Sequence, residues 1–192
     1  MRNSRLFALF FVVIGACLMT ATARAADQVV QLVSVQSGKC LEPAKGSSAN
    51  GTAIVQVACD GSAAQFWDMH FMASGFANNH TWYQLTNQST HLCLDARGGA
   101  VNGTPIQQWT CSGISNEKWS TTNCQSTAAQ TTCEVSSLIY NSAVAQDRPY
   151  THCLATPGTA DGASMVLMAC QIISSQQWKL QGFVSDAVKK AK

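Results

Sequence analysis

Charged side chains are scarce in this sequence. Only 11% of its 192 residues are Asp, Glu, Lys or Arg, whereas Ser, Thr, Asn and Gln are abundant. The first 25 residues hold three arginines and no acidic residue, so the remaining chain carries no basic excess. Nucleic-acid binding requires a basic surface, and this balance therefore argues against a nucleic-acid partner. It is typical of secreted all-β domains.

Long apolar runs are missing after the N-terminus. The single run, Leu6 to Met19, follows Arg2 and Arg5. It is followed by Ala23-Arg24-Ala25, which has the small-x-small form of a signal-peptide cleavage site. The run is too short and too near the start for a membrane span of about 20 residues. We therefore expect a signal peptide over residues 1–25, a secreted or periplasmic protein, and no transmembrane span in the mature chain.

An alternative interpretation retains part of this segment as a lipid anchor. Ile14-Gly15-Ala16-Cys17 places small residues before a cysteine, as bacterial lipoprotein signals do. Cys17 would then be lipidated and would hold the protein on a membrane. Both alternatives stay open.

Motifs of catalysis are absent as well. The chain has no Gly-x-Ser-x-Gly elbow, no His-Glu-x-x-His pair and no phosphate-binding loop. We expect neither enzymatic activity nor a cofactor.

Cysteine, in contrast, is frequent: eight cysteines follow Cys17, and an even number in an exported chain indicates disulfides. Their order predicts the pairs Cys40 with Cys59, Cys93 with Cys111, Cys124 with Cys133, and Cys153 with Cys170. A zinc site using His91 or His152 would need nearby cysteines as free thiolates, so we expect no metal.

The cysteines are part of an internal repeat. Each of three units has a first Cys-Leu, an Asn-Gly or Asp-Gly turn, a second Cys and a closing tryptophan, which is Trp67, Trp119 or Trp178. The cysteines 124 and 133 fall in an insertion between the second and third units. The units fill residues 27–181 as one domain, and residues 182–192 remain as a C-terminal tail.

Within the units the local pattern is strand and turn. Short apolar pieces at residues 29–33, 53–58, 82–85 and 165–169 alternate with turn residues, as hairpins do. Three repeats of about four short strands indicate a closed all-β body, because closure removes strand edges that would aggregate. We predict a β-trefoil of three pseudo-repeats with intra-repeat disulfides.

The repeat resembles that of the ricin B-chain type lectins, whose units carry Cys-Leu-Asp, Asn-Gly-Thr-x-Ile/Val-Gln, a second Cys and a closing Gln-x-Trp. The second unit has Cys93-Leu94-Asp95 and Asn102-Gly103-Thr104-Pro105-Ile106, and the likeness covers nearly all of the chain after the signal. It implies a β-trefoil with the closing tryptophans packed in a shared core.

The resemblance also implies a shallow sugar pocket in each unit, and only the second unit has the full set of contacts: Asp95, Gln107, Trp109 and Asn116. A carboxylate can accept hydrogen bonds from vicinal hydroxyls, an indole can cover sugar C–H groups, and amides both donate and accept. Glu117 stands where the family usually has a glutamine that helps to hold the aspartate.

The other two units have lost most of this set. Glu42, Val55, Val57 and Ala64 stand at the four positions in the first unit, and Ala155, Val166, Met168 and Ser175 in the third. We expect these two pockets to be weak or inactive.

The leading hypothesis is a lectin for terminal galactose or N-acetylgalactosamine on glycoproteins or glycolipids. The alternative is the glycan-binding delivery subunit of a bacterial toxin similar to cytolethal distending toxin, in which the first and third faces would contact partner subunits. A protease inhibitor acting through the loop between Cys124 and Cys133 is a third hypothesis. Asp95 and Glu117 form a carboxylate pair, but both fall at binding positions, so hydrolysis is not expected.

Overall fold

The computed structural model describes residues 28–76, 80–98, 101–126, 131–137 and 152–182. The predicted signal peptide, which contains the Cys17 of the alternative lipid-anchor interpretation, and nearly all of the predicted tail lie outside the described residues. Among the residues that are described, no helix is long and apolar enough to cross a membrane.

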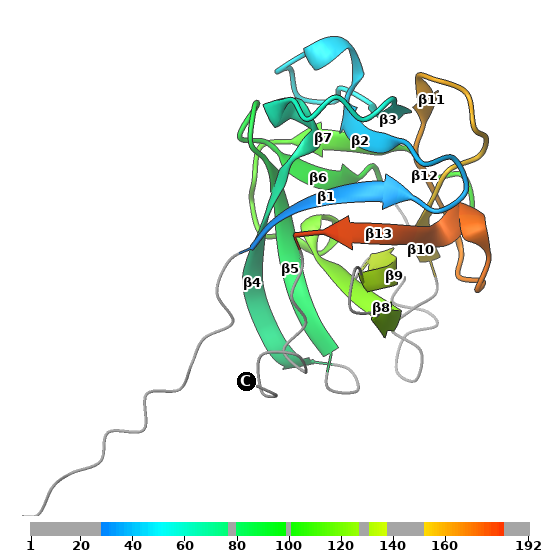
Figure 1. The fold of residues 1–192 in the computed structure, drawn as a ribbon. Coiled ribbons are helices and arrows are strands. Elements are labelled where there is room, and N and C mark those ends of the chain that lie inside the picture. Colours follow the sequence, from blue (N-terminus) through cyan, green and yellow to red (C-terminus); the bar gives the residue numbers. More distant parts are fainter. Residues whose placement is uncertain (1–27, 77–79, 99–100, 127–130, 138–151, 183–192) are drawn as a thin grey trace, which may run out of the picture.

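The described residues are folded as strands with four single 3-10 turns (Figure 1). The strands are β1 (Gln28–Ser34), β2 (Cys40–Pro43), β3 (Ile54–Val57), β4 (Trp67–Phe76), β5 (His80–Asn87), β6 (Cys93–Ala96), β7 (Ile106–Trp109), β8 (Trp119–Ser126), β9 (Thr131–Ser137), β10 (His152–Ala155), β11 (Ala163–Ser164), β12 (Val166–Ala169) and β13 (Gln177–Gln181). The 3-10 turns are η1 (Ala44–Gly46), η2 (Ala63–Gln65), η3 (Ser115–Glu117) and η4 (Ser174–Gln176). The apolar pieces expected to be strands lie on β1, β3, β5 and β12.

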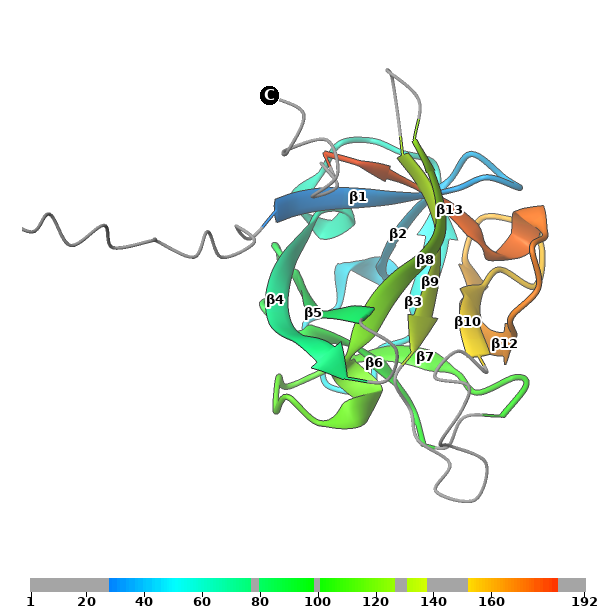
Figure 2. The same cartoon turned by 90° about the horizontal axis from the view of Figure 1, so that it is seen from below.

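Six strands form a closed ring of antiparallel pairs. β1 pairs with β4, β4 with β5, β5 with β8, β8 with β9, β9 with β13, and β13 with β1. β8 and β9 run side by side in both views (Figures 1 and 2). Each unit adds one further hairpin, which is β2–β3, β6–β7 or β10–β12. This closed, threefold arrangement confirms the predicted β-trefoil.

The three closing tryptophans lie in the core, as predicted. Trp67, Trp119 and Trp178 are at most 1% exposed. The indole Nε1 of each donates a hydrogen bond to the carbonyl of the Leu that follows the first cysteine of its own unit, at 3.3, 2.9 and 3.0 Å. Each tryptophan therefore satisfies its one polar group while its rings fill the space between the hairpin and the barrel.

The glycine turns link each unit to the next. The backbone N–H of Gly51 donates to Gln108 O at 2.9 Å, that of Gly103 to Leu167 O at 2.8 Å, and that of Gly162 to Gln56 O at 2.8 Å. The first unit is thus joined to the second, the second to the third, and the third to the first. All three glycines have positive φ, a region that residues with a Cβ rarely adopt.

Disulfides close a loop in every unit. The structure confirms Cys40 with Cys59, Cys93 with Cys111 and Cys153 with Cys170, with Cα atoms 5.0 to 5.1 Å apart. Each contributes on the order of 2 to 4 kcal/mol by restricting the unfolded chain. The side chains of Cys124 and Cys133 lie outside the described part, so their pairing stays a prediction.

Candidate functional site

A cavity of about 420 Å³ lies on the second unit. Four of the five residues predicted to form the site, Asp95, Gln107, Trp109 and Asn116, line this cavity. Its other lining residues are Gly51, Arg97, Gly98 and Ile114.

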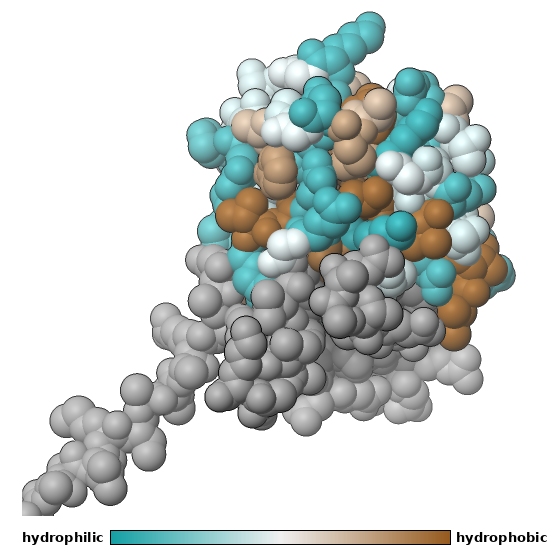
Figure 3. All heavy atoms as spheres, in the orientation of Figure 1, coloured by the Kyte–Doolittle hydropathy of each residue, from teal (hydrophilic) through white to brown (hydrophobic). Residues whose placement is uncertain are grey.

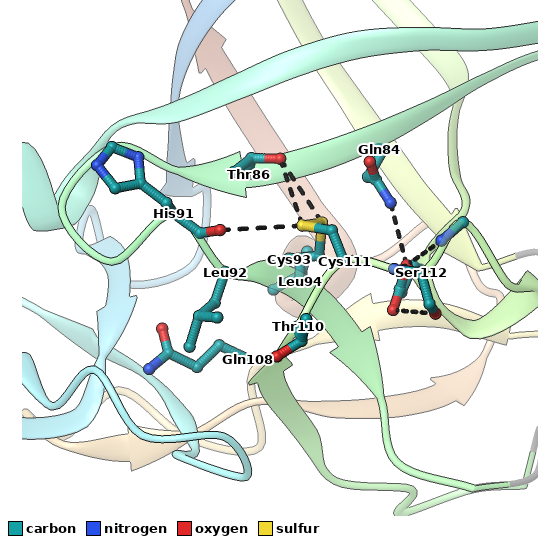
Figure 4. The surroundings of a disulfide bond; sticks show 12 residues. Gln84, Thr86, His91, Leu92, Cys93, Leu94, Gln108, Thr110, Cys111 and Ser112 are labelled. Carbon is teal, nitrogen blue, oxygen red and sulfur yellow. Dashed lines mark hydrogen bonds between the residues drawn. A yellow bond between two sulfur atoms is a disulfide. The ribbon is translucent and has the colours of Figure 1, made fainter.

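The β6–β7 hairpin brings three of these side chains to one face. Asp95 and Gln107 are directly opposite each other across the two strands. Trp109 follows Gln107 by two residues, and alternate residues of a strand share a face. The Cys93–Cys111 disulfide fixes the open end of the hairpin, where Thr86 Oγ1 lies 3.6 and 3.8 Å from the two sulfurs (Figure 4). Asn116 reaches the same cavity from η3.

Asp95 is held at the base of the cavity. Its side chain is only 3% exposed, and it accepts a hydrogen bond from Gln107 Nε2 to Oδ1 at 2.7 Å and one from Asn116 Nδ2 to Oδ2 at 2.9 Å. Each carboxylate oxygen retains capacity for a further donor. Burial raises the pKa of Asp95 above its ordinary value, and the nearby charge of Glu117 adds to this against the lowering effect of the two amides. The site thus presents a hydrogen-bond acceptor, the Asp95 carboxylate, whose orientation is fixed by two amides.

Trp109 forms an exposed wall of the cavity. Its side chain is 44% exposed, unlike the three core tryptophans. A Cβ built on Gly51, in the turn of the first unit, would lie 3.5 Å from Trp109 Cζ3 and 3.9 Å from Gln107 Oε1. Asn50 fixes this turn, because its Oδ1 accepts from the Thr110 N–H at 2.8 Å. Two units therefore build the site.

Glu117, predicted as a binding residue, does not line the cavity. It is fully buried and accepts hydrogen bonds from Ser112 N and Ser112 Oγ at 2.8 Å each, from Gly113 N at 2.7 Å and from Gln84 Nε2 at 3.0 Å. A carboxylate can only accept hydrogen bonds, and Glu117 is the acceptor in all four of these.

The corresponding residue of the first unit is Gln65, which uses its amide differently. Gln65 Nε2 donates to Glu42 Oε2 at 3.1 Å and to Ala58 O at 3.0 Å, whereas its Oε1 accepts from Asp60 N at 2.9 Å. Glu117 has no amide N–H with which to donate to Asp95. Asn116 and Gln107 supply the donors in its place.

A second cavity, also of about 420 Å³, lies on the third unit. Its lining includes Ala155, Met168 and Ser175, which stand at the acid, aromatic and asparagine positions. The cavity therefore retains the space of the site without its carboxylate or its indole. The expectation that it is weak or inactive stays a prediction.

Sequence reasoning missed four lining residues of the second-unit cavity. Arg97 could have been found, because it follows Asp95 by two residues at the end of a strand. Gly51, Gly98 and Ile114 had no such signal, since their place depends on loop geometry and on a neighbouring unit.

Metal ligands are not gathered anywhere in the described part of the chain, where no group of three or more His, Cys, Asp or Glu is placed to hold an ion. The cysteines near His91 and His152 are Cys93 and Cys153, and both are in disulfides. They are not available as thiolate ligands.

Solved structures of other proteins share this fold. The chain is 21% identical to the designed threefold symmetric protein ThreeFoil, with a TM-score of 0.64 over 79% of this chain and 96% of that one. It is 23% identical to the exo-beta-1,3-galactanase 1,3Gal43A from Clostridium thermocellum, with a TM-score of 0.66 over 81% of this chain and 30% of that one. It is 14% identical to the ricin B-like lectin of Macrolepiota procera in complex with lactose, with a TM-score of 0.60 over 83% of this chain and 98% of that one. At these identities the similarity concerns the fold alone.

Two family models match the sequence, although no curated protein does. The model described as ricin-type beta-trefoil lectin domain-like matches residues 20–109. The model of the ricin-type beta-trefoil lectin domain matches residues 81–186, which is more than half of the chain. The chain therefore belongs to the family of ricin-type beta-trefoil lectin domains, a carbohydrate-binding and non-catalytic family.

Proposed function

We propose that this protein is an exported lectin that binds terminal galactose or N-acetylgalactosamine through a single site in its second repeat. Asp95, Gln107, Trp109 and Asn116 contact the sugar. The observation that carries the proposal is the Asp95 carboxylate, fixed by two amides at the base of an open cavity beside an exposed indole.

The chemistry of galactose fits these groups. Its hydroxyls at carbons 3 and 4 lie on the same side of the ring and can both donate to Asp95 in charge-assisted hydrogen bonds. The C–H groups on the opposite face form an apolar patch that the Trp109 indole can cover. Gln107 and Asn116 each use one amide hydrogen on Asp95 and retain their oxygens as acceptors for sugar hydroxyls.

Further support comes from the structural neighbours. The Macrolepiota procera lectin was solved with lactose, whose terminal sugar is galactose, and the Clostridium thermocellum enzyme is a galactanase. Export is supported by the three disulfides, because disulfides persist in oxidising compartments.

Glu117 has a supporting part in this proposal. It is buried and bonded to Ser112, Gly113 and Gln84, so it acts on the sugar only through its charge on Asp95.

Calorimetric titration with lactose and N-acetylgalactosamine tests the proposal, with maltose as the non-galactose control. Asp95→Asn retains the shape but loses the charge, and we expect on the order of ten-fold weaker binding because charge-assisted hydrogen bonds become neutral. Glu42→Gln changes the matched acid of the first unit and leaves affinity unchanged. No galactose-dependent heat, or equal losses in the two variants, contradicts the proposal.

A second candidate function is the delivery subunit of a toxin, favoured by apolar side chains beside the third-unit cavity. Met168, Ile172 and Ile173 are 37%, 69% and 45% exposed. Brown, apolar atoms gather at the lower right of Figure 3, over the orange segment that precedes η4 in Figure 1. A contiguous exposed apolar patch is a common feature of protein-contact surfaces. Co-purification with a nuclease-like subunit encoded next to the gene would support this candidate, and a chain that purifies alone from its native source would contradict it.

A further inference from the structure

Arg97 lies at the rim of the second-unit cavity. It follows Asp95 by two residues, directly after β6 ends, and both residues line the cavity. Asp95 is buried at the base, whereas Arg97 is exposed. One charged group is therefore recessed and the other faces solvent at the entrance.

The guanidinium of Arg97 has no charged partner in the part of the chain that the structure describes. Within the described residues no ion pair joins it to a carboxylate, and the two donors that hold Asp95 are the amides of Gln107 and Asn116. It is also the only arginine that the described ranges contain. Structural pairing does not explain its presence at the cavity.

The backbone presents Arg97 beside open space. Its N–H donates to Pro105 O at 2.9 Å, which anchors the residue to the hairpin. Gly98 follows with φ +89°, and a Cβ built there would meet no atom within 4 Å. Among the described residues none crowds the rim at Gly98, which therefore has room for a substituent that extends out of the cavity.

We infer that this site prefers galactosides that carry an anionic group, a carboxylate or a sulfate ester, and that Arg97 binds this group at the rim. The inference rests on the proposed galactose site and names its ligand class. The planar guanidinium matches both anions with two parallel hydrogen bonds. The negative charge of Asp95 disfavours an anion at the base, so the acidic group projects outward while the galactose hydroxyls face Asp95.

Affinity ratios test this inference. Lactose is compared with 3′-sialyllactose, 6′-sialyllactose and a 3′-sulfated galactoside, which separate the carboxylate from the sulfate and one linkage from another. Because ion pairs in water are weak, we expect at least one acidic ligand to bind about three- to five-fold more tightly than lactose. This preference should shrink at about 0.5 M salt, because salt screens exposed charges.

Variants of Arg97 test whether this residue causes the preference for acidic galactosides. In Arg97→Gln the ratio of acidic to neutral affinity should fall to about one, and in Arg97→Lys part of it should remain, because lysine retains the charge without the planar fork. Lys179→Gln on β13 removes one positive charge away from the cavity and should leave the ratio as in the wild type.

The outcomes separate this inference from the proposed function. If lactose binds and no acidic ligand binds better, the inference is overturned and the galactose site stands. An unchanged ratio in Arg97→Gln overturns it too. If neither neutral nor acidic galactosides bind, the proposed function itself fails.

Discussion

Replacing Gly51 by alanine tests whether the first unit helps to build the site of the second. Gly51 has φ +81°, and its Cβ would lie 3.5 Å from Trp109 Cζ3 and 3.9 Å from Gln107 Oε1. Gly103 is the matched control, because it occupies the same turn of the second unit with φ +85° and has no atom within 4 Å of its Cβ.

The two variants should lose similar stability. A residue with a Cβ costs roughly 1 to 2 kcal/mol in the left-handed region, and the stiffer unfolded chain offsets about 0.4 to 1 kcal/mol of this. We expect a net loss of about 1 kcal/mol in each, which lowers Tm by about 2 to 4 °C in a chain of this size. Differential scanning calorimetry measures this loss.

Only Gly51→Ala should weaken binding of lactose. Its methyl group would lie 3.9 Å from Gln107 Oε1, the acceptor that remains after Gln107 Nε2 has donated to Asp95, and would restrict the approach of a sugar hydroxyl to it. One lost hydrogen bond is worth about 1 kcal/mol, or about five-fold in Kd. Calorimetric titration compares the two variants. Equal affinities for lactose in Gly51→Ala and Gly103→Ala would refute the claim that the first unit's turn is a wall of the site.

Two further predictions concern charge and aromatic side chains. Because the pKa of Asp95 is raised, affinity for lactose should fall as pH drops through that raised value, and Glu117→Gln should move the loss to lower pH by removing a neighbouring charge. The free energy of unfolding depends on pH in the opposite sense. Because the pKa of Asp95 is raised in the folded state, a proton on Asp95 favours folding, and this stabilisation is lost as pH rises from the ordinary pKa to the raised one. Titration of lactose binding against pH checks this, and an unshifted midpoint in Glu117→Gln contradicts it. Trp67→Ala should destabilise the fold by about 3 to 5 kcal/mol, whereas Trp109→Ala should change stability by less than about 0.5 kcal/mol and abolish measurable binding. Urea unfolding with binding assays separates the two, and similar unfolding midpoints would contradict the assigned roles.

Much of the fold could be predicted because the same sequence repeat occurs three times in the chain. The Cys pairs, the turns and Trp67, Trp119 and Trp178 recur in register, and all three tryptophans are buried as expected. The resemblance to the ricin B-chain type lectins predicts Asp95, Gln107 and Trp109 as one set, and the strand pairing seen in the structure explains why they share a face. The pairing of Cys124 with Cys133 and the division into signal, domain and tail stay predictions.

The sequence by itself determined which residues form each unit, because strand, turn and disulfide signals act over short separations. Only the tertiary structure decided what lies between units. Closure of the barrel places the Gly51 turn of the first unit against β7 of the second. Within the second unit, the tertiary structure also decided that Glu117 accepts hydrogen bonds from Ser112, Gly113 and Gln84 and does not line the cavity. The contact of the Gly51 turn depends on how the three units pack together, which no single repeat encodes.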